Sequence, residues 1–471
     1  MTKRLILLLA FLVCLPFAAY AETAQNHADI KYPTLDFKPP KTVRVALKNG
    51  MVLHMLEDHE LPLVEIASLV RIGSAWEPAE KSGLASITGH LWRSGGTKTV
   101  APGDMDERLA FIGAQMETSI GAESGTIGLK VLSKDIDEGL ALFADAIKNP
   151  AFDEKRFATL KDQMKEALRR EYDEPDALVE REFLKAVFRG HPFGQTPTPE
   201  TVERITVEDC RAFYRGHVGP ESFVIGIAGD FDPKEMTARF EKMFADFKPA
   251  AKKFPPIPKV EDKVKPGVYL LDKDLPQTAL RMGHIGISRK DPDFDAARVM
   301  NYILGGGGFS SRLMKEVRTK RGLAYAVWSY FSGGDSEKGA FILGGETKTE
   351  STGEFISISR QQMNDVIEKG ITPEELQQAK EAIINSFIFA FDKNADVLGR
   401  YLWIEYYRMP KDYLETFRAR IDAITLDQAR AAAKKYLHPD RMVIIAVGNA
   451  KKVDGKLAEF GKITPITIEA R

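Results

Sequence analysis

Hydrophobic and polar residues recur along the chain with two different periods. Short apolar runs, such as LVEIASLVRIG from Leu63 and GAFILGGETK from Gly339, predict strands. Longer stretches with apolar residues three or four apart, such as DEKRFATLKDQMKEALRRE from Asp153 and TPEELQQAKEAIINSF from Thr372, predict helices, and Thr372 and Glu375 are predicted to form a capping box at the start of the second. Strands and helices do not alternate one to one. The pattern therefore predicts an α+β fold, with helices packed on one face of a largely antiparallel sheet.

One pattern of apolar and polar residues occurs twice. ITVEDCRAFYRGHVGPESFVIGIAG from Ile205 aligns without a gap on ITLDQARAAAKKYLHPDRMVIIAVG from Ile424. In each copy a threonine, Thr206 or Thr425, is the predicted N-cap of a helix, a proline-containing turn comes next, and an apolar run predicts a strand. LEDHELPLVEI and LLDKDLPQTAL, earlier in the two halves, are fainter copies of each other. The chain is thus predicted to consist of two homologous α/β-sandwich halves.

The predicted boundary between the halves is rich in proline and lysine. FKPAAKKFPPIPKVEDKVKPG from Phe247 has the composition of a semi-rigid exposed linker. The expected organisation is a signal peptide at 1–21, an extended segment at 22–40, an N-terminal domain at 41–247, a linker at 248–265 and a C-terminal domain at 266–471.

Composition narrows the function and the compartment. Hydrophobic residues make up 44% of the 471, and the formal net charge of −1 favours neither nucleic acid nor an anionic membrane as a partner. Lys3 and Arg4, an apolar run and the small-residue site Ala19-Tyr20-Ala21 predict a cleavable secretory signal, and no later stretch is apolar enough to span a membrane. Cleavage leaves Cys210 as the one cysteine. We expect a periplasmic protein without an internal disulfide.

Two segments carry a resemblance to a known family. LGGGGFSSRLMKEVRTKRGLAYAVWSY from Leu304 and SGLASITGHLWRSGGT from Ser82 resemble the glycine-rich segment and the zinc-motif helix of the pitrilysin/insulinase family of zinc peptidases. The resemblance extends over most of residues 40–460. It implies a two-halved fold, with zinc in the first half and substrate-holding residues in the second.

The family's inverted zinc motif, H-x-x-E-H, is degenerate in this chain. Two histidines one helical turn apart bind the metal, and the glutamate between them activates a water molecule. The matching positions are Ser86, Gly89 and His90. Serine is a poor zinc ligand and glycine has no side chain to accept a proton. His90 alone is therefore predicted to be a packed or hydrogen-bonded histidine.

The family's third ligand, a glutamate, should fall at Glu166 or Ala167. At about 100° per residue, Ala167 lies at the edge of the apolar stripe of its helix, whereas Glu166 points nearly the opposite way. That stripe consists of Phe157, Leu160, Met164 and Leu168. The inward position therefore matches Ala167, and the third ligand is predicted to be missing as well.

No other set of ligands is evident along the sequence. His54 and His59 lie in a predicted strand and turn, where a spacing of five does not bring two imidazoles together. His191, His217, His284 and His438 are isolated, and convergence of residues distant in sequence stays open. We expect this chain to bind no cofactor of its own.

The second half matches two further family positions. In the family, an arginine and a tyrosine in the pattern R-x-x-x-x-x-x-Y hold the substrate backbone, and Arg318 and Tyr325 match both. A guanidinium can donate paired hydrogen bonds to a carbonyl, and a phenol can donate to a developing oxyanion. Gly322 is expected to end the helix of Arg318, so that Tyr325 begins the next strand. Alternatively, Arg318 is one of several solvated cations and Tyr325 is strand core.

The residues and the resemblance leave three hypotheses open. The first is a subunit without catalytic residues of its own, which binds peptide or unfolded protein and supplies Arg318 and Tyr325 to a homologous H-x-x-E-H partner that holds the zinc. The second is a catalytically dead structural or peptide-binding scaffold, which would associate with itself or with an unrelated partner. The third, an independently active metallopeptidase, is the least compatible with the missing ligands.

Overall fold

The structure is a computed structural model that describes residues 37–252, 255–453 and 455–468. Pro39–Arg471 form one unit by backbone contacts, and every element below lies within it. The predicted signal peptide and most of the predicted extended segment lie outside the described residues. Among the residues described, no helix is long and apolar enough to cross a membrane.

The first sheet is built from the N-terminal half and has the strand order β1-β2-β6-β3-β5-β4. β2 and β6 run parallel, and the other neighbours run antiparallel. The strands are β1 (Val43–Ala46), β2 (Val52–Glu57), β3 (Leu63–Val70), β4 (Gln115–Ile120), β5 (Gly125–Leu132) and β6 (Phe223–Gly229).

The second sheet is built from the C-terminal half and has the order β12-β7-β11-β8-β10-β9. β7 runs parallel to both of its neighbours, and the remaining pairs are antiparallel. The strands are β7 (Gly267–Asp272), β8 (Gln277–Ile285), β9 (Val327–Phe331), β10 (Ala340–Lys348), β11 (Val443–Gly448) and β12 (Ile463–Pro465). Two largely antiparallel sheets with many helices confirm the predicted α+β fold.

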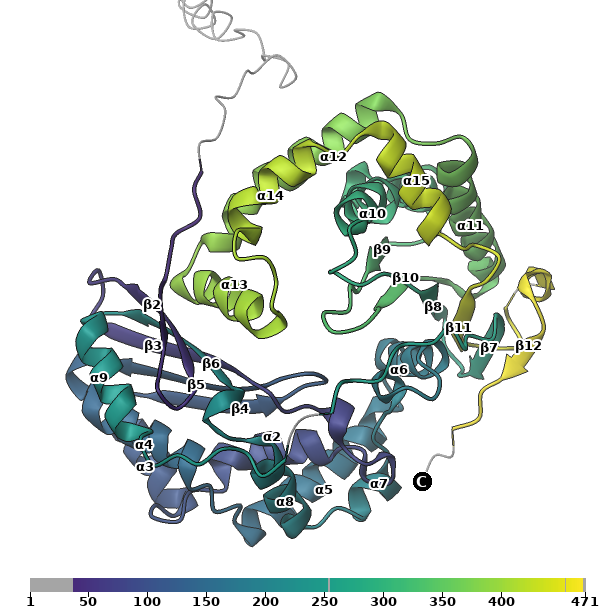
Figure 1. Cartoon of the computed structure of the whole chain (residues 1–471). Helices are drawn as coiled ribbons and strands as arrows, with labels where there is room; N and C mark the ends of the chain where they lie inside the picture. Colours follow the sequence, from purple (N-terminus) through teal and green to yellow (C-terminus); the bar gives the residue numbers. More distant parts are fainter. Residues whose placement is uncertain (1–36, 253–254, 454, 469–471) are drawn as a thin grey trace, which may run out of the picture. The chain divides into compact units, whose positions relative to one another are not determined.

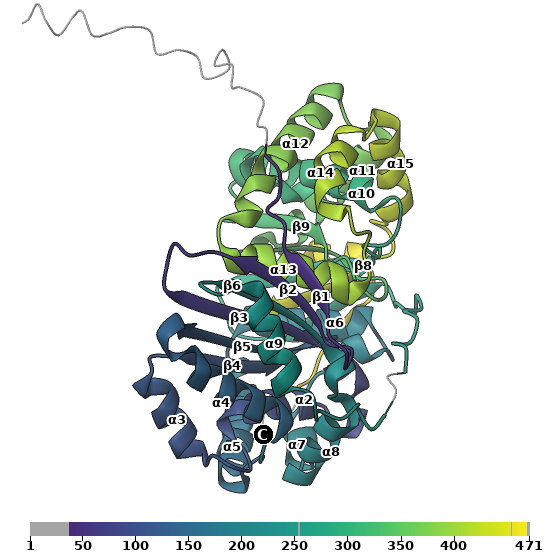
Figure 2. The ribbon, with the colours of Figure 1, turned by 60° about the vertical axis from the view of Figure 1, so that its left-hand side comes forward.

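The helices divide between the two halves (Figures 1 and 2). Those of the N-terminal half are α2 (Leu84–Ser94), α3 (Pro102–Phe111), α4 (Ile136–Lys148), α5 (Glu154–Glu171), α6 (Pro175–Val187), α7 (Pro199–Glu203), α8 (Val207–His217) and α9 (Pro233–Met243). Those of the C-terminal half are α10 (Phe294–Asn301), α11 (Thr352–Glu368), α12 (Pro373–Ser386), α13 (Asn394–Tyr407), α14 (Tyr413–Asp422) and α15 (Leu426–Tyr436), with π-helical segments η7 (Tyr302–Gly306) and η9 (Met314–Lys320).

The repeated sequence unit forms the same structure in both halves. Thr206 and Thr425 cap α8 and α15, each in a capping box with the residue three positions later. Each helix leads into a fully buried strand, β6 or β11. Thr372 and Glu375 form the predicted capping box of α12. These reciprocal bonds pair N–H groups that the first helical turn would otherwise leave without partners.

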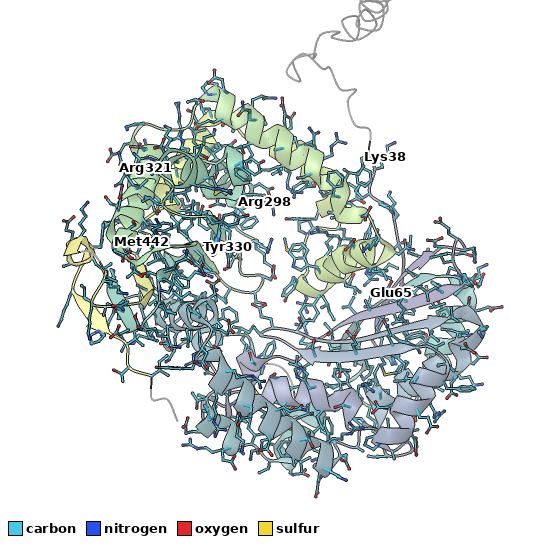
Figure 3. All side chains as sticks on the ribbon, turned by 180° about the vertical axis from the view of Figure 1, so that it is seen from behind. Lys38, Glu65, Arg298, Arg321, Tyr330 and Met442 are labelled. Atoms are coloured by element: carbon cyan, nitrogen blue, oxygen red, sulfur yellow. The ribbon has the colours of Figure 1, made fainter. Side chains whose placement is uncertain are left out.

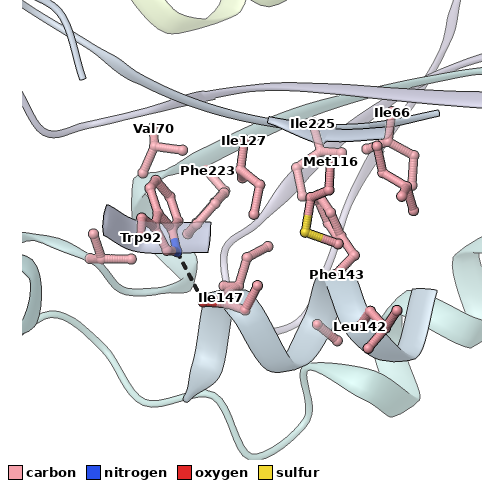
Figure 4. Close-up of a cluster of buried hydrophobic side chains, with 14 of the residues drawn as sticks. Ile66, Val70, Trp92, Met116, Ile127, Leu142, Phe143, Ile147, Phe223 and Ile225 are labelled. Atoms are coloured by element: carbon pink, nitrogen blue, oxygen red, sulfur yellow. Dashed lines mark hydrogen bonds between the residues drawn. The ribbon is translucent and has the colours of Figure 1, made fainter. Parts of the chain in front are cut away.

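The N-terminal core lies between one face of its sheet and the helices below it. Alternate strand residues such as Ile66, Ile127 and Ile225 point to this face and are buried with side chains of α2 and α4 (Figure 4). Trp92 is fully buried, and its indole N–H donates to the carbonyl of Ala146, 2.9 Å away. Period-two alternation thus places mainly apolar residues on this sheet face, with Ser68 as a buried polar exception.

The opposite face of each sheet receives a helix from the other half. α13 packs on β6, β3 and β2, where Leu402 and Tyr406 meet Val224 (Figure 1). Conversely, α6 packs on β8 and β11, and its Phe183 joins a buried cluster with the second sheet. The sequence predicted helices on one face only. Each half thus receives a helix from the other, an arrangement we call the helix exchange. It depends on contacts between residues far apart in sequence, which helical periodicity does not specify.

The stretch predicted as a linker has neither helix nor strand among its described residues. It is not exposed throughout, because Val260 is buried beside the second sheet. The carbonyls of Pro255 and Pro258 accept hydrogen bonds from Trp76 and His191. The proposed domain boundaries remain a prediction.

Candidate functional site

Helix α2 begins at a buried carboxylate that precedes it in sequence. Glu77 accepts hydrogen bonds from the backbone N–H of Gly83 at 3.0 Å and of Ala85 at 2.8 Å, and from the Ser82 hydroxyl. Gly83 has φ 103°, which allows the chain to turn into the helix. Burial raises the pKa of Glu77 despite these donors. The carboxylate takes the role of a helix cap and fixes where the degenerate zinc motif starts.

Three of the four degenerate zinc positions line one cavity. Ser86 and His90 of α2 and Ala167 of α5 border a space of about 370 Å³. The exposed ring of His90 donates from Nδ1 to the carbonyl of Ser86, 2.8 Å away, so it is hydrogen-bonded but not packed in the core. Glu166 points elsewhere and forms an ion pair with Arg169 on the exposed side of α5. The cavity lining thus includes Ala167 and not Glu166, which is the position that helical phase favoured.

Glu171 also lines this cavity, one helical turn beyond Ala167, and was not singled out from the sequence. Burial raises its pKa, and its carboxylate lies 3.7 Å from Arg181. The sequence could have indicated Glu171, because it lies four residues after Ala167 and therefore on the same face of the helix. His90 and Glu171 are the two residues of the cavity lining whose side-chain types commonly bind zinc.

Gly89 is the fourth degenerate position, and it faces strand β4 instead of the cavity. It is buried, and its carbonyl accepts a hydrogen bond from Thr118 Oγ1 at 2.7 Å. A Cβ atom at this position would overlap the backbone nitrogen of Ile120 and lie 2.9 Å from the carbonyl carbon of Ser119. A glutamate therefore does not fit here unless β4 moves.

The residues present do not fit a catalytic zinc ion. Zinc in such a site takes three protein ligands and a water molecule. This cavity offers one imidazole, with a carboxylate that faces an arginine, and has serine and alanine at the other positions. Over the described ranges, no group of three His, Cys, Asp or Glu residues is arranged to hold a metal ion.

Among the other histidines, His54 and His59 lie in separate surroundings, whereas His284 and His438 contact each other. His59 pairs with Glu57 and Asp230, whereas His54 is buried beside Glu405. His54 and His59 therefore do not converge, as predicted. His284 and His438 do meet, because the backbone N–H of His438 donates to His284 Nε2 at 3.2 Å. This contact joins residues 154 positions apart, which the sequence could not reveal.

Arg318 and Tyr325 lie together in the C-terminal half, with a third residue. The guanidinium carbon of Arg318 is 4.7 Å from the centre of the Tyr325 ring and 4.6 Å from that of the Phe309 ring. Both rings are largely exposed, Tyr325 at 84% and Phe309 at 68%. We call Phe309, Arg318 and Tyr325 the arginine–aromatic cluster. Phe309 comes directly after the glycine run and was not singled out from the sequence.

The chain around this cluster differs in detail from the expectation. Arg318 lies in the π-helical segment η9, and Gly322, at φ 63°, donates its N–H to the Arg318 carbonyl and turns the chain. Tyr325 does not begin the next strand, because β9 starts two residues later at Val327. It is not strand core either. Sequence periodicity does not register a π-helix, whose wider turn changes the direction in which the chain leaves the helix.

Neighbouring cations behave differently from Arg318. Lys320 and Arg321 both pair with Glu316, at 2.5 and 2.6 Å. Arg318 forms no ion pair within the described ranges, and its guanidinium carbon lies over the rings of Phe309 and Tyr325 instead. Its surroundings therefore differ from those of the neighbouring cations, and its role stays a prediction.

The glycine run serves close packing at one position and a turn at another. A Cβ at Gly305 would lie 2.6 Å from the backbone nitrogen of Ser329, so η7 approaches β9 closely only because this residue is glycine. Gly308 has φ 55° in open space, which is turn geometry. The run thus places Phe309 at the surface, next to Arg318.

Known proteins match the chain along most of its length. One family model, described as insulinase (peptidase family M16), matches residues 54–198, and another, described as the peptidase M16 inactive domain, matches residues 204–383. An uncharacterized zinc protease of Rickettsia bellii is 28% identical over 369 residues, covering 76% of this chain and 88% of the relative. The Helicobacter pylori non-peptidase homolog YmxG is 24% identical over 400 residues, covering 84% and 91%.

A solved structure agrees with these sequence matches. The crystal structure of a peptidase M16 inactive domain from Pseudomonas fluorescens has a TM-score of 0.81 with this chain at 26% identity, covering 87% of this chain and 98% of the other. The chain belongs to the insulinase family, peptidase family M16, and lacks the family's zinc motif. It is an insulinase-like protein whose zinc-motif positions hold Ser86, Gly89 and His90.

Proposed function

We propose that this chain is the activity-completing subunit of a periplasmic zinc peptidase. It binds peptide and contributes Arg318 and Tyr325 to the active site of a homologous partner that carries an intact H-x-x-E-H motif. The observation that carries the proposal is the asymmetry between the halves. The four degenerate positions hold Ser86, Gly89, His90 and Ala167, of which only the histidine can bind zinc, whereas Arg318 and Tyr325 match the family pattern and are adjacent and accessible.

The chemistry of the arginine–aromatic cluster supports this role. The in-plane N–H groups of Arg318 suit the carbonyl oxygens of an extended peptide. The exposed Tyr325 hydroxyl can donate to an oxygen that gains negative charge during peptide hydrolysis. Neither task requires a metal on this chain. Zinc belongs to the partner in this proposal. The predicted secretory signal of this chain supports a periplasmic location, and the partner would have to be exported as well.

Reconstitution with a partner tests the proposal. A family member with an intact H-x-x-E-H motif, encoded in the neighbouring reading frame, is purified alone and together with this chain. Zinc content, complex mass and hydrolysis of a fluorogenic peptide library are measured for each preparation. We expect one zinc ion per heterodimer, and hydrolysis that requires both chains. Stoichiometric zinc on this chain alone, or equal hydrolysis by the partner alone, would contradict the proposal.

One comparison favours a second candidate, a peptide-binding scaffold without proteolysis. The Helicobacter pylori relative is named a non-peptidase homolog. A scaffold would copurify with itself or with an unrelated protein, and peptides would bind without being cleaved. Native mass spectrometry of the chain isolated from its own periplasm distinguishes the two, because the first proposal requires a zinc-containing family member in the complex.

A further inference from the structure

The C-terminal half contains a second cavity, distinct from both sites above. It has a volume of about 740 Å³ and lies among α10, α12, α13 and α14, in the size range typical of small-molecule sites. Its apolar wall includes Trp403, Phe387 and Phe417, and the last two rings stack at 4.5 Å. Figure 3 labels Arg298, which lines the cavity from α10.

Three arginines line this cavity, and their guanidinium groups donate no hydrogen bond to any other residue in the described part of the chain. They are Arg289, Arg298 and Arg400. Arg289 lies 3.0 Å from Asp335, yet its buried Nε is not aligned for a hydrogen bond. The nearest carboxylate to Arg298 is Asp295, 3.9 Å away, and Asp295 itself pairs with Arg420 at 2.9 Å. Arg400 forms no ion pair with any residue of the described ranges.

Aromatic rings hold two of these guanidiniums in place. Arg298 lies over the rings of Phe294 and Phe417, at 5.1 and 5.2 Å. Arg289 lies over Phe294 at 5.5 Å and Trp403 at 5.9 Å. Stacking fixes the planes of the groups but leaves their N–H donors unused. Arg289 and Arg298 are partly buried, so their unused donors are poorly satisfied unless an anion or water accepts from them, whereas Arg400 is exposed.

The net charge of the cavity lining narrows the chemical class of ligand that fits. Three arginines face two aspartates, Asp335 and Asp396, so the lining carries a formal excess of one positive charge. That excess suits a monoanion better than a phosphate dianion. A carboxylate matches the guanidinium fork, and an apolar group attached to it would pack against the aromatic wall.

We propose that this cavity binds a small organic carboxylate whose apolar part packs on Trp403 and Phe417 while its carboxylate accepts from Arg298 and Arg400. The proposal does not depend on the proposed function, because every lining residue belongs to the C-terminal half and none is part of the arginine–aromatic cluster. The ligand could be a free metabolite or the end of a peptide, since both present the same group.

Calorimetric titration of the full-length mature chain tests this inference. The probes are 3-phenylpropionate, its uncharged amide, phenyl phosphate and a short peptide with a C-terminal phenylalanine. We expect the carboxylate to bind at least about tenfold more tightly than the amide and more tightly than phenyl phosphate. A response to the peptide but not to the free acid would assign the site to peptide ends, and the reverse would assign it to small molecules.

Variants connect the binding to the cavity. Arg298→Met and Arg400→Met should each weaken carboxylate binding at least about tenfold, whereas Arg204→Met, at an exposed arginine of the other half, should not. Arg298→Lys, which keeps the charge, covers the case in which Arg298→Met fails to fold, and it should weaken binding less. Equal binding of acid and amide, unchanged binding in both Met variants, or no binding of any carboxylate probe would overturn the inference.

Discussion

The two halves share the order of five of their six strands and a capped helix–strand unit, yet the cavity in one half and the arginine–aromatic cluster in the other offer different chemistry. In the N-terminal half, the cavity between α2 and α5 retains one histidine of the zinc set, and Gly89 is packed against β4. In the C-terminal half, the guanidinium of Arg318 lies over two exposed rings next to the glycine turn. The comparison teaches that the two halves differ in local side chains, because each half has its own buried core around them.

The largest expected effect comes from removing the side-chain donors of Arg318 and Tyr325. Arg318→Ala combined with Tyr325→Phe should lower kcat of the reconstituted heterodimer by about 10²- to 10³-fold, the usual effect of removing a donor to an oxyanion. Steady-state peptide hydrolysis measures it. Lys320→Ala is the matched control, because Lys320 lies on the same segment but pairs with Glu316. Unchanged turnover with an intact complex would exclude a role for the cluster in hydrolysis.

Gly89 provides the second test, on stability. Gly89→Ala should lower the free energy of unfolding by about 1–3 kcal/mol, because the added methyl overlaps the β4 backbone. Gly103→Ala in α3, where a Cβ meets nothing within 4 Å, should be neutral or stabilising by up to about 1 kcal/mol. Urea unfolding measures both. If the two variants were equally stable, the close approach to β4 would be wrong.

Glu77 provides a third test, because it anchors α2. Glu77→Gln should cost about 1–2 kcal/mol, since an amide nitrogen cannot accept a hydrogen bond, whereas both oxygens of a carboxyl group can accept in its protonated form as well as in its ionised form. Burial raises the pKa of Glu77 in the folded state, so its ionisation is less favourable there than in the unfolded chain. The stability advantage of the wild type over Glu77→Gln should therefore be largest at pH below about 4 and shrink as pH rises through the folded-state pKa. Urea unfolding between pH 3.5 and 8 measures this trend, and an advantage that grew with pH would contradict it.

The smallest expected effect concerns Phe309. Phe309→Leu should reduce kcat/KM of the heterodimer about two- to fivefold, because an exposed cation–π contact contributes about 0.5–1 kcal/mol to the placement of Arg318. Phe389→Leu, at another exposed phenylalanine of the same half, is the control. Identical kinetics in the two variants would show that the ring does not position Arg318.

Local patterns predicted the parts of the molecule that local physics determines. Thr206, Thr372 and Thr425 were identified as helix caps because capping involves residues three positions apart. Ala167 was preferred to Glu166 because helical phase fixes which side chains share a face. The caps are confirmed, whereas the assignment of Ala167 to the third zinc position stays a prediction.

Other features depend on contacts that hydrophobic periodicity does not encode. Glu77 reaches α2 only because the intervening chain folds back, and Phe309 meets Arg318 across a 3-10 turn and a π-helix. The helices exchanged between the sheets, α6 and α13, were predicted as helices but not placed. These features result from tertiary packing, which overrides local preference.

The exchange of α6 and α13 has a consequence for how the chain could be divided. A cut within residues 248–265 would leave each fragment with one sheet face uncovered and one apolar helix without its surface. Each fragment would thus present what the other lacks, and burial of that surface would drive their reassociation. The architecture therefore favours fragment complementation: two separately expressed fragments should associate and restore the fold of the connected chain.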